Sequence, residues 1–173
     1  PLNAETADAV WELCNQRLRE GLTARKMIRM SRVTLLCTTD DPADSLEWHR
    51  KIAEDEGFDV QVLPTWRPDR AMSPEKEDYP AYLEELGRAA DVKIDSFGAL
   101  IRALKKRMDL FGKMGCRISD HGLPFVMYDP TAEEEIEGIF SRRLSGSSLS
   151  SKEIRQFKTA FLLEMGREYN RRD

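Results

Sequence analysis

The amino-acid sequence predicts an α/β protein that is rich in helices and contains three parallel strands. Three short runs, at residues 33–37, 59–63 and 116–119, have the composition of strands. Long stretches with helical periodicity separate them, and strands joined through helices pair in parallel with right-handed crossovers. Three strands are few for so many helices, so the pattern favours an incomplete sheet or barrel.

The first predicted element is a helix over residues 7–18, which Gly21 ends. A short helix over residues 23–30 leads into the strand at 33–37, a compact apolar run that suits burial on both faces. The apolar residues of the first helix recur at helical spacing and predict one buried face: Ala7, Val10, Trp11, Cys14 and Leu18.

The polar segment after the first strand predicts the start of another helix. Asp41 suits the N-cap, Pro42 the first helical position and Asp44 the first turn, where negative charge is favourable. We expect this helix to run to about Asp55 and Gly57 to close it.

The second strand, at 59–63, is followed by the loop at 66–69. Residues 72–79 are polar and predict a long surface connection. Helices are expected at 81–90 and 96–113. The second of these carries a strongly periodic apolar stripe: Phe97, Leu100, Ile101, Leu104, Met108 and Phe111.

The last third of the chain is predicted to be helical. Thr131 with Glu134, and Ser150 with Glu153, have the spacing of capping boxes. Residues 145–148 form the hinge between the two helices. The final helix has a buried stripe: Ile154, Phe157, Phe161, Met165 and Tyr169.

The composition excludes several classes of partner. A net charge of −4 over 173 residues leaves no concentrated basic face of the kind that binds nucleic acid. No apolar run approaches the ~18 residues of a membrane span. The three cysteines are odd in number and lack ligand spacing, so we expect reduced, mostly buried thiols in a cytoplasmic protein.

Charged residues gather where each predicted strand ends. Arg67 and Asp69 flank a proline after the second strand, Asp40 and Asp41 follow the first, and Asp120 precedes His121 after the third. The carboxyl ends of parallel strands meet at one edge, so these side chains are expected to share one rim. An arginine there can grip a carboxylate or phosphate with two N–H groups.

Each candidate also has a structural interpretation. Arg67 and Asp69 could simply pin their turn, and Asp40 could brace its loop. Asp120 and His121 could act in proton transfer, although neighbours on an extended chain point to opposite faces. His49 fits a half-buried, hydrogen-bonded histidine. Two histidines 72 positions apart make a self-contained transition-metal site improbable.

At these clusters the chain resembles uronate isomerase (glucuronate isomerase), a family of the amidohydrolase superfamily. The matching motifs follow one another along nearly the whole chain: TTDDP at 38–42 with Asp44, Ser45, Leu46, Glu47 and His49, VLPTWRPD at 62–69, Gly115-Cys116 with Ser119-Asp120-His121, Arg142-Arg143-Leu144, and QFKTA at 156–160.

The resemblance implies a much longer protein with a distorted (β/α)8 barrel and a helical elaboration. Residues 1–173 would form a single internal segment of it, a helix-rich partial (β/α)8 TIM-type barrel with three parallel strands and their helices. A chain that begins at Pro1 without an initiator methionine is consistent with such a piece. Open strand edges favour self-association, for example as a homo-oligomer.

The resemblance also implies an activity, the aldose–ketose isomerisation of hexuronates. D-Glucuronate would be converted to D-fructuronate and D-galacturonate to D-tagaturonate through an enediol, beside a divalent metal such as zinc. The family's His-x-His motif on its first strand and its catalytic aspartate on its last strand have no counterpart here. The metal ligands and proton-transfer groups are therefore expected outside the chain, and the chain alone is expected to be inactive.

In such a barrel, residues at the C-terminal ends of the strands contact the substrate. The resemblance then assigns Arg67 to the carboxylate or a hydroxyl of the hexuronate, with Asp69 orienting it. Asp120 and His121 would be a second contact or a bracing pair, and Asp40 is the weakest candidate. Two other interpretations stay open: a non-catalytic sugar-acid-binding module, and a helical interaction module whose loops are only structural.

Overall fold

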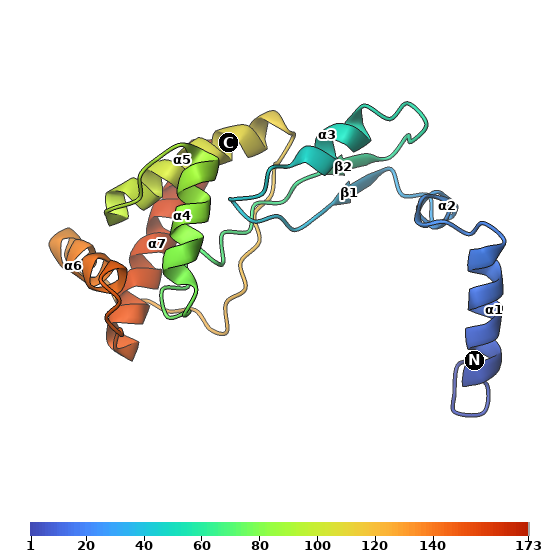
Figure 1. Cartoon of the computed structure of the whole chain (residues 1–173), viewed down its shortest axis with the longest axis horizontal. Coiled ribbons are helices and arrows are strands. Elements are labelled where there is room, and N and C mark those ends of the chain that lie inside the picture. The colour runs from blue at the N-terminus through green and yellow to red at the C-terminus, as the bar shows by residue number, and fades with distance from the viewer. Residues whose placement is uncertain (173) are drawn as a thin grey trace.

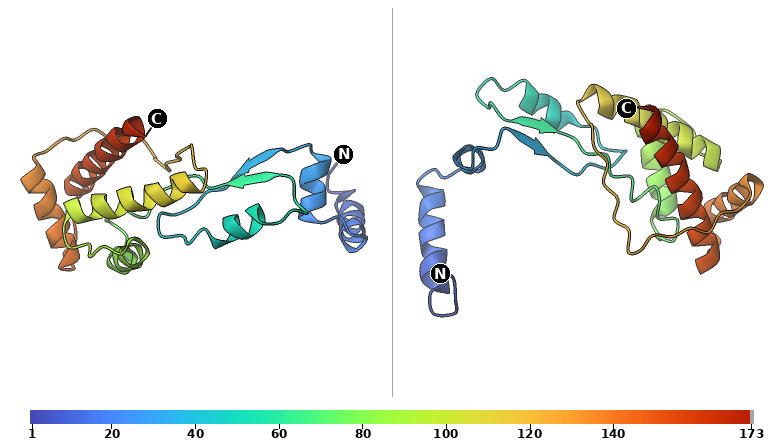
Figure 2. Two further views of the ribbon diagram at one scale, coloured as in Figure 1. Left: turned by 90° about the horizontal axis from the view of Figure 1, so that it is seen from above. Right: turned by 180° about the vertical axis from the view of Figure 1, so that it is seen from behind.

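The computed structural model describes residues 1–172 and contains seven helices and two short strands. In chain order these are α1 (Ala7–Arg19), α2 (Ala24–Met30), β1 (Leu35–Cys37), α3 (Glu47–Ala53), β2 (Gln61–Leu63), α4 (Tyr79–Ala90), α5 (Phe97–Lys113), α6 (Glu133–Leu144) and α7 (Ser151–Arg171). Figure 1 shows an arm of α1 and α2, a middle part of two strands with α3, and a body of α4 to α7. The views from above and behind show the same separation (Figure 2).

The sheet is smaller than the sequence predicts. β1 and β2 pair in parallel, with Leu36 beside Val62, and α3 lies against β2. The third strand, expected at 116–119, is reduced to one parallel bridge between Trp66 and Ser119. The predicted α/β class with parallel strands is therefore confirmed, but the prediction of three strands is not. Trp66 alone faces this segment, so no ladder of hydrogen bonds extends the bridge.

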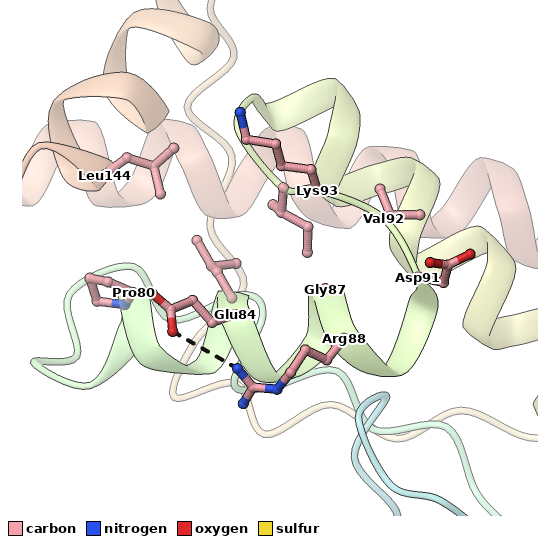
Figure 3. A pocket seen from close by; sticks show the side chains of 10 residues that line it. Pro80, Glu84, Gly87, Arg88, Asp91, Val92, Lys93 and Leu144 are labelled. Carbon is pink, nitrogen blue, oxygen red and sulfur yellow. Dashed lines mark ion pairs between the residues drawn. The ribbon is translucent and has the colours of Figure 1, made fainter.

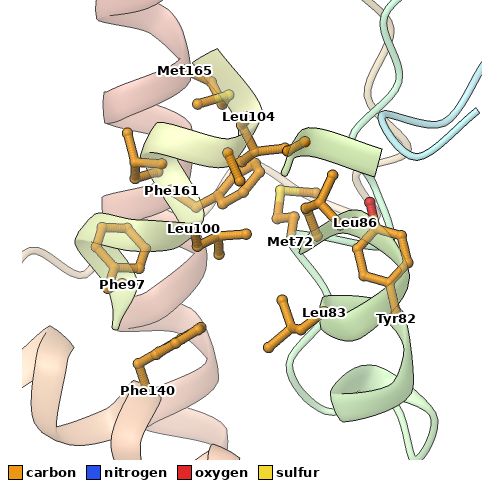
Figure 4. Packing of buried hydrophobic residues seen from close by; sticks show 14 of the residues in the cluster. Met72, Tyr82, Leu83, Leu86, Phe97, Leu100, Leu104, Phe140, Phe161 and Met165 are labelled. Carbon is orange, nitrogen blue, oxygen red and sulfur yellow. The ribbon is translucent and has the colours of Figure 1, made fainter. Parts of the chain in front are cut away.

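The hydrophobic core lies in the body of α4 to α7, where α5 runs between α4 and α7 (Figure 4). The stripes predicted on α5 and α7 are confirmed in their central residues, since Leu100, Leu104, Phe157 and Phe161 are fully buried. The Phe157 ring contacts four other aromatic rings, which add geometric preference to the burial of area: Tyr79, Phe97, Phe140 and Phe161.

Local capping sets where the body helices begin. Ser96 caps α5 and Ser150 forms the predicted capping box with Glu153 at the start of α7. The box predicted at Thr131 is wrong: α6 begins after Ala132 without a side-chain cap. Its Glu137 instead accepts hydrogen bonds from the first two backbone N–H groups of α5, at 2.8 and 2.9 Å. This contact joins α6 to the open end of α5.

The prediction that the first helix has a buried face is wrong. α1 and α2 form at the expected positions, and α1 ends just before Gly21, which has φ of 91°. However, α1 has no buried residue, and Trp11 and Leu18 are 67% and 54% exposed. The apolar stripe is present, but nothing among residues 1–172 packs against it. No helix in that range is long and apolar enough to span a membrane.

The predicted burial of β1 and of the cysteines is also wrong. Leu35 and Cys37 of β1 are exposed, because a sheet of two strands has no layer on its outer face. Cys14 is exposed as well, and Cys116 is half-buried. All three thiols are free, as expected.

Two loops differ from their predictions. Asp41 does not cap a helix: its carboxylate accepts from Ala43 N at 2.9 Å in a local turn, and α3 begins only at Glu47, after Leu46 in the left-handed conformation. The segment 72–79 is not a surface connection at its two ends. Met72 and Tyr79 are buried, and the Tyr79 hydroxyl donates to Ala71 O at 3.0 Å.

Arg107 ties the loop after β1 to the helical body. This buried side chain of α5 donates to Pro42 O at 2.7 Å, to Asp44 O at 2.6 Å and to Ala89 O at 3.0 Å. Burial lowers its pKa. Three carbonyl partners offset the cost of burying the charge, so the strands and the body are held in one arrangement.

We predict that Arg107→Met lowers the free energy of unfolding by at least about 2 kcal/mol, because three backbone carbonyls lose a charged donor. Urea denaturation of the chain measures this. Arg102→Met is the matched control, since Arg102 is an exposed residue of the same helix, and its effect should stay within about 0.5 kcal/mol. Equal effects of the two substitutions would contradict the role of Arg107.

Candidate functional site

The segments that follow β1 and β2 meet the segment 118–120 at Trp66. Its neighbours Thr65 and Arg67 exchange hydrogen bonds with Asp40: Asp40 N donates to Thr65 O at 3.1 Å and Arg67 N donates to Asp40 O at 3.0 Å. On the other side Trp66 N donates to Ile118 O at 3.1 Å and Asp120 N donates to Trp66 O at 2.9 Å. One extended segment therefore sets the relative position of all three clusters.

The Trp66 side chain fixes this junction to the helical body. It is 2% exposed and meets Phe111 of α5 edge-on, with the ring centroids 5.0 Å apart. An indole buried in this way resists displacement, since its removal would leave a large cavity. The strand ends are thus anchored on α5 through a ring and through Arg107.

Arg67, Asp69, Asp120, His121 and Gly122 form what we call the rim cluster. Arg67 Nε lies 2.7 Å from Asp69 Oδ2, and Arg67 Nη1 lies 3.2 Å from Asp120 Oδ2. The hydrogen bond that Arg67 donates to Asp69, together with the charges of Asp69 and Asp120, raises the pKa of Arg67. The guanidinium remains partly exposed and points two of its edges at carboxylates.

Gly122 completes the turn around Asp69. Its backbone N–H donates to Asp69 Oδ1 and Oδ2 at 3.1 and 3.0 Å. A Cβ at this position would lie 2.8 Å from Asp69 Oδ2 and 2.9 Å from Arg67 Nη2. Only glycine allows this approach, because any side chain would push the ion pair away.

Asp120 and His121 point to different partners, as expected for neighbours on an extended segment. Asp120 pairs with Arg67, whereas His121 Nε2 lies 2.8 Å from the hydroxyl of Tyr169 at the end of α7. Burial lowers the pKa of His121, while the charges of Asp69 and Asp120 oppose this effect. The imidazole is therefore biased toward its neutral form.

Asp40 belongs to a separate cluster. Its Oδ2 accepts from Thr38 Oγ1 at 2.6 Å and from Thr65 N at 3.1 Å. Thr38 Oγ1 also lies 2.8 Å from Nε2 of His49, which is buried and hydrogen-bonded as predicted. These bonds brace β1 against β2. Within residues 1–172, the Asp40 carboxylate makes no hydrogen bond or ion pair with Arg67 or Asp120, so the structure supports the bracing role of Asp40.

The charge of the rim cluster limits its chemistry. One guanidinium faces two carboxylates, so the three groups together carry a net charge of −1. Such a set suits hydrogen bonds to hydroxyl groups, which can both donate to the carboxylates and accept from the guanidinium. Within residues 1–172, no group of three or more His, Cys, Asp or Glu side chains is placed to hold a metal ion.

Two cavities lie elsewhere in the body and contain no residue of the rim cluster. The first, of about 830 Å³, is bordered by α4, the segment that follows it and Leu144 (Figure 3). Its Glu84 and Arg88 pair with each other at 3.9 Å. The second, of about 470 Å³, lies among α5, α6 and α7. Neither offers a polar arrangement comparable to the rim cluster.

Sequence reasoning missed Gly122 and Tyr169 as members of the site. A glycine directly after the pair Asp120-His121 is a signal of close backbone approach, and this signal could have identified Gly122 as a member of the site. Tyr169 was predicted only as part of the buried stripe of the last helix. Its contact with His121 spans 48 positions, so no local pattern reveals it.

The chain is similar to known proteins over nearly its whole length. The family model described as glucuronate isomerase matches residues 1–173. A curated uronate isomerase of Lachnospira eligens is 55% identical over 99% of the chain, and one of Lachnoclostridium phytofermentans is 54% identical over 98%. The crystal structure of uronate isomerase from Thermotoga maritima superposes with a TM-score of 0.86 at 35% identity over 98% of the chain. The chain spans about 37% of each of these relatives.

We predict that Gly122→Ala destabilises the chain by about 1–3 kcal/mol, since the added methyl group overlaps Asp69 and Arg67. Urea denaturation checks the stability, and the ¹⁵Nε chemical shift of Arg67 should move as its bond to Asp69 lengthens. The control is Gly166→Ala in α7, where a Cβ meets nothing within 4 Å. It should stabilise the chain by about 0.5–1 kcal/mol. An Arg67 signal that is unchanged in Gly122→Ala would contradict the close packing.

Proposed function

This chain belongs to the glucuronate isomerase family, and we propose that it is the part of a uronate isomerase that supplies one wall of the substrate site. The observation that carries the proposal is the rim cluster at the carboxyl ends of the strands, where proteins of barrel type bind their ligands. The complete protein would interconvert D-glucuronate and D-fructuronate, and D-galacturonate and D-tagaturonate. A proton would move between C2 and C1 through an enediol.

In this proposal the rim cluster binds the open-chain sugar acid and does not itself move the proton. Arg67 donates to the substrate, and Asp69 and Asp120 hold the guanidinium in place. Because both carboxylates already compensate Arg67, a sugar hydroxyl is a better partner than the substrate carboxylate. His121 provides the second contact, and Asp40 only braces the strands.

The catalytic groups would lie outside this chain. A divalent metal such as zinc would polarise the substrate oxygens when bound, but the residues described do not form a site that fits it. We therefore assign no step through a metal to these residues. The segment alone would be inactive, also with added zinc. The complete protein would act in the cytoplasm. Isomerisation by the isolated chain would refute this division of roles.

Two surfaces of residues 1–172 are uncovered. The apolar face of α1 is exposed, and β1 and β2 have open edges. We propose that residues 1–173 are a single internal segment of a (β/α)8 barrel, and that further strands and helices of the same protein cover these surfaces. In the isolated chain the open edges favour association with a second copy.

We predict that Arg67→Lys in the complete protein lowers kcat/KM for D-glucuronate by about 10- to 100-fold. A point charge cannot replace the planar fork, and a charge-assisted hydrogen bond contributes about 1.5–3 kcal/mol. Steady-state kinetics measure the effect. The control is Arg88→Lys, since Arg88 is exposed and pairs with Glu84 on α4. Its effect on the activation free energy should stay within about 0.5 kcal/mol, which is a change in kcat/KM of about twofold or less. Wild-type kinetics of Arg67→Lys would refute the assigned contact.

We predict that Trp11 is accessible in the isolated chain and shielded in the complete protein. A Trp48→Phe background removes the other exposed indole, since Trp66 is buried. Acrylamide should then quench Trp11 fluorescence strongly in the chain and weakly in the complete protein. The Trp11→Phe difference spectrum identifies the signal. Equal quenching in both proteins would show that α1 is not covered by the rest of the barrel.

A further inference from the structure

Tyr169 joins the last helix to the rim cluster through one hydrogen bond. Its hydroxyl lies 2.8 Å from His121 Nε2, and the two ring centroids are 5.8 Å apart. Within residues 1–172, this is the one hydrogen bond of normal length that either atom makes. The position of the imidazole therefore depends on a residue 48 positions away in the sequence.

The end of α7 is held independently of the rim cluster. Glu168, which precedes Tyr169, is buried and lies 2.9 Å from Lys105 Nζ of α5. Arg172, which follows α7, pairs with Asp109 of α5 at 2.5 Å. These contacts fix the last turn of α7 on α5, so the phenol approaches His121 from a rigid support.

Both rings are neutral near pH 7. Burial raises the pKa of Tyr169 far above its usual range, so the hydroxyl keeps its proton. Burial lowers the pKa of His121, an effect that the charge of Arg67 supports and those of Asp69 and Asp120 oppose. A neutral imidazole has one N–H group, and its hydrogen bonds decide which nitrogen carries the proton.

The surroundings of the phenol decide the direction of the bond. The Trp66 indole N–H and the Ser119 hydroxyl both face the phenol oxygen. The indole nitrogen is buried and has no hydrogen-bond partner of normal length in residues 1–172. An indole N–H can only donate, and a serine hydroxyl can donate as well, so both approach the phenol oxygen as an acceptor. The phenol proton then goes to Nε2 of His121, its acceptor at 2.8 Å.

We infer that Tyr169 is a positioning residue, which donates to Nε2 of His121 and thereby holds the imidazole as the neutral tautomer with its proton on Nδ1. His121 then serves the rim cluster as a hydrogen-bond donor, and its Nε2 is not available as a base. His121 Nδ1 is enclosed and has no partner within residues 1–172. A buried donor of this kind is satisfied by an incoming oxygen atom. That this oxygen belongs to a hexuronate rests on the proposed function.

The tautomer is measured directly by long-range ¹H–¹⁵N correlation spectra of the ¹⁵N-histidine-labelled chain at pH 7. The chain has two histidines, and His49→Gln assigns the signals. We expect a protonated Nδ1 and an unprotonated Nε2 at His121. The opposite pattern would overturn the inference.

Tyr169→Phe keeps the ring and removes the donor. We expect a mixture of both His121 tautomers and a higher His121 pKa, because the bond that favours neutral Nε2 is lost. Tyr128→Phe, at a tyrosine that is 76% exposed, should leave the His121 signals unchanged. His121 signals in Tyr169→Phe identical to wild type would also overturn the inference.

Kinetics of the complete protein separate this inference from the proposed function. There Tyr169→Phe should raise KM for D-glucuronate several-fold with a smaller change in kcat, since His121 would bind and not catalyse. A lower kcat with unchanged KM would overturn the donor role. If the wild-type complete protein did not isomerise hexuronates, the proposed function would fail, while the tautomer measurement would still decide the role of Tyr169.

Discussion

The arrangement of the rim cluster depends on the backbone of Trp66 and its immediate neighbours. The two sides of this extended segment bond to the segments that follow the other strand ends, at Asp40 and at 118–120. Its indole is buried against Phe111, so the junction is fixed to α5. A bridge of one residue is a weak sheet by itself. It is stable here because the helical body holds both sides, through the indole and through the three carbonyls bound by Arg107.

Charge compensation then determines what the cluster can recognise. Asp69 and Asp120 occupy two positions on the Arg67 guanidinium, and Gly122 allows the chain to close over Asp69. An arginine in this state is a rigid donor whose positive charge is already compensated by two carboxylates. Such a group distinguishes hydroxyl positions of a sugar better than it attracts a distant anion. The substrate carboxylate would then need another cation in the complete protein.

Much of the fold could be predicted from the sequence, because helical periodicity and caps are local signals. The positions of α4, α5 and α7 follow from such signals. The convergence of Arg67, Asp69 and Asp120 follows from their places after predicted parallel strands. Burial of α1 could not be predicted, since periodicity identifies an apolar face but not the partner that covers it. The predicted start of α3 is wrong because the Asp41 carboxylate accepts a hydrogen bond within a local turn and does not cap the helix. The roles of Gly122 and Tyr169 depend on contacts between distant segments, which no local pattern contains.

The central claim is that these strand ends form one wall of a hexuronate site. A crystal structure of the complete protein with bound D-glucuronate or D-fructuronate tests it most directly. We expect a sugar hydroxyl within hydrogen-bond distance of the Arg67 guanidinium, with Asp69 and Asp120 still paired to it. A sugar bound elsewhere in the protein, with no contact to the rim cluster, would contradict it.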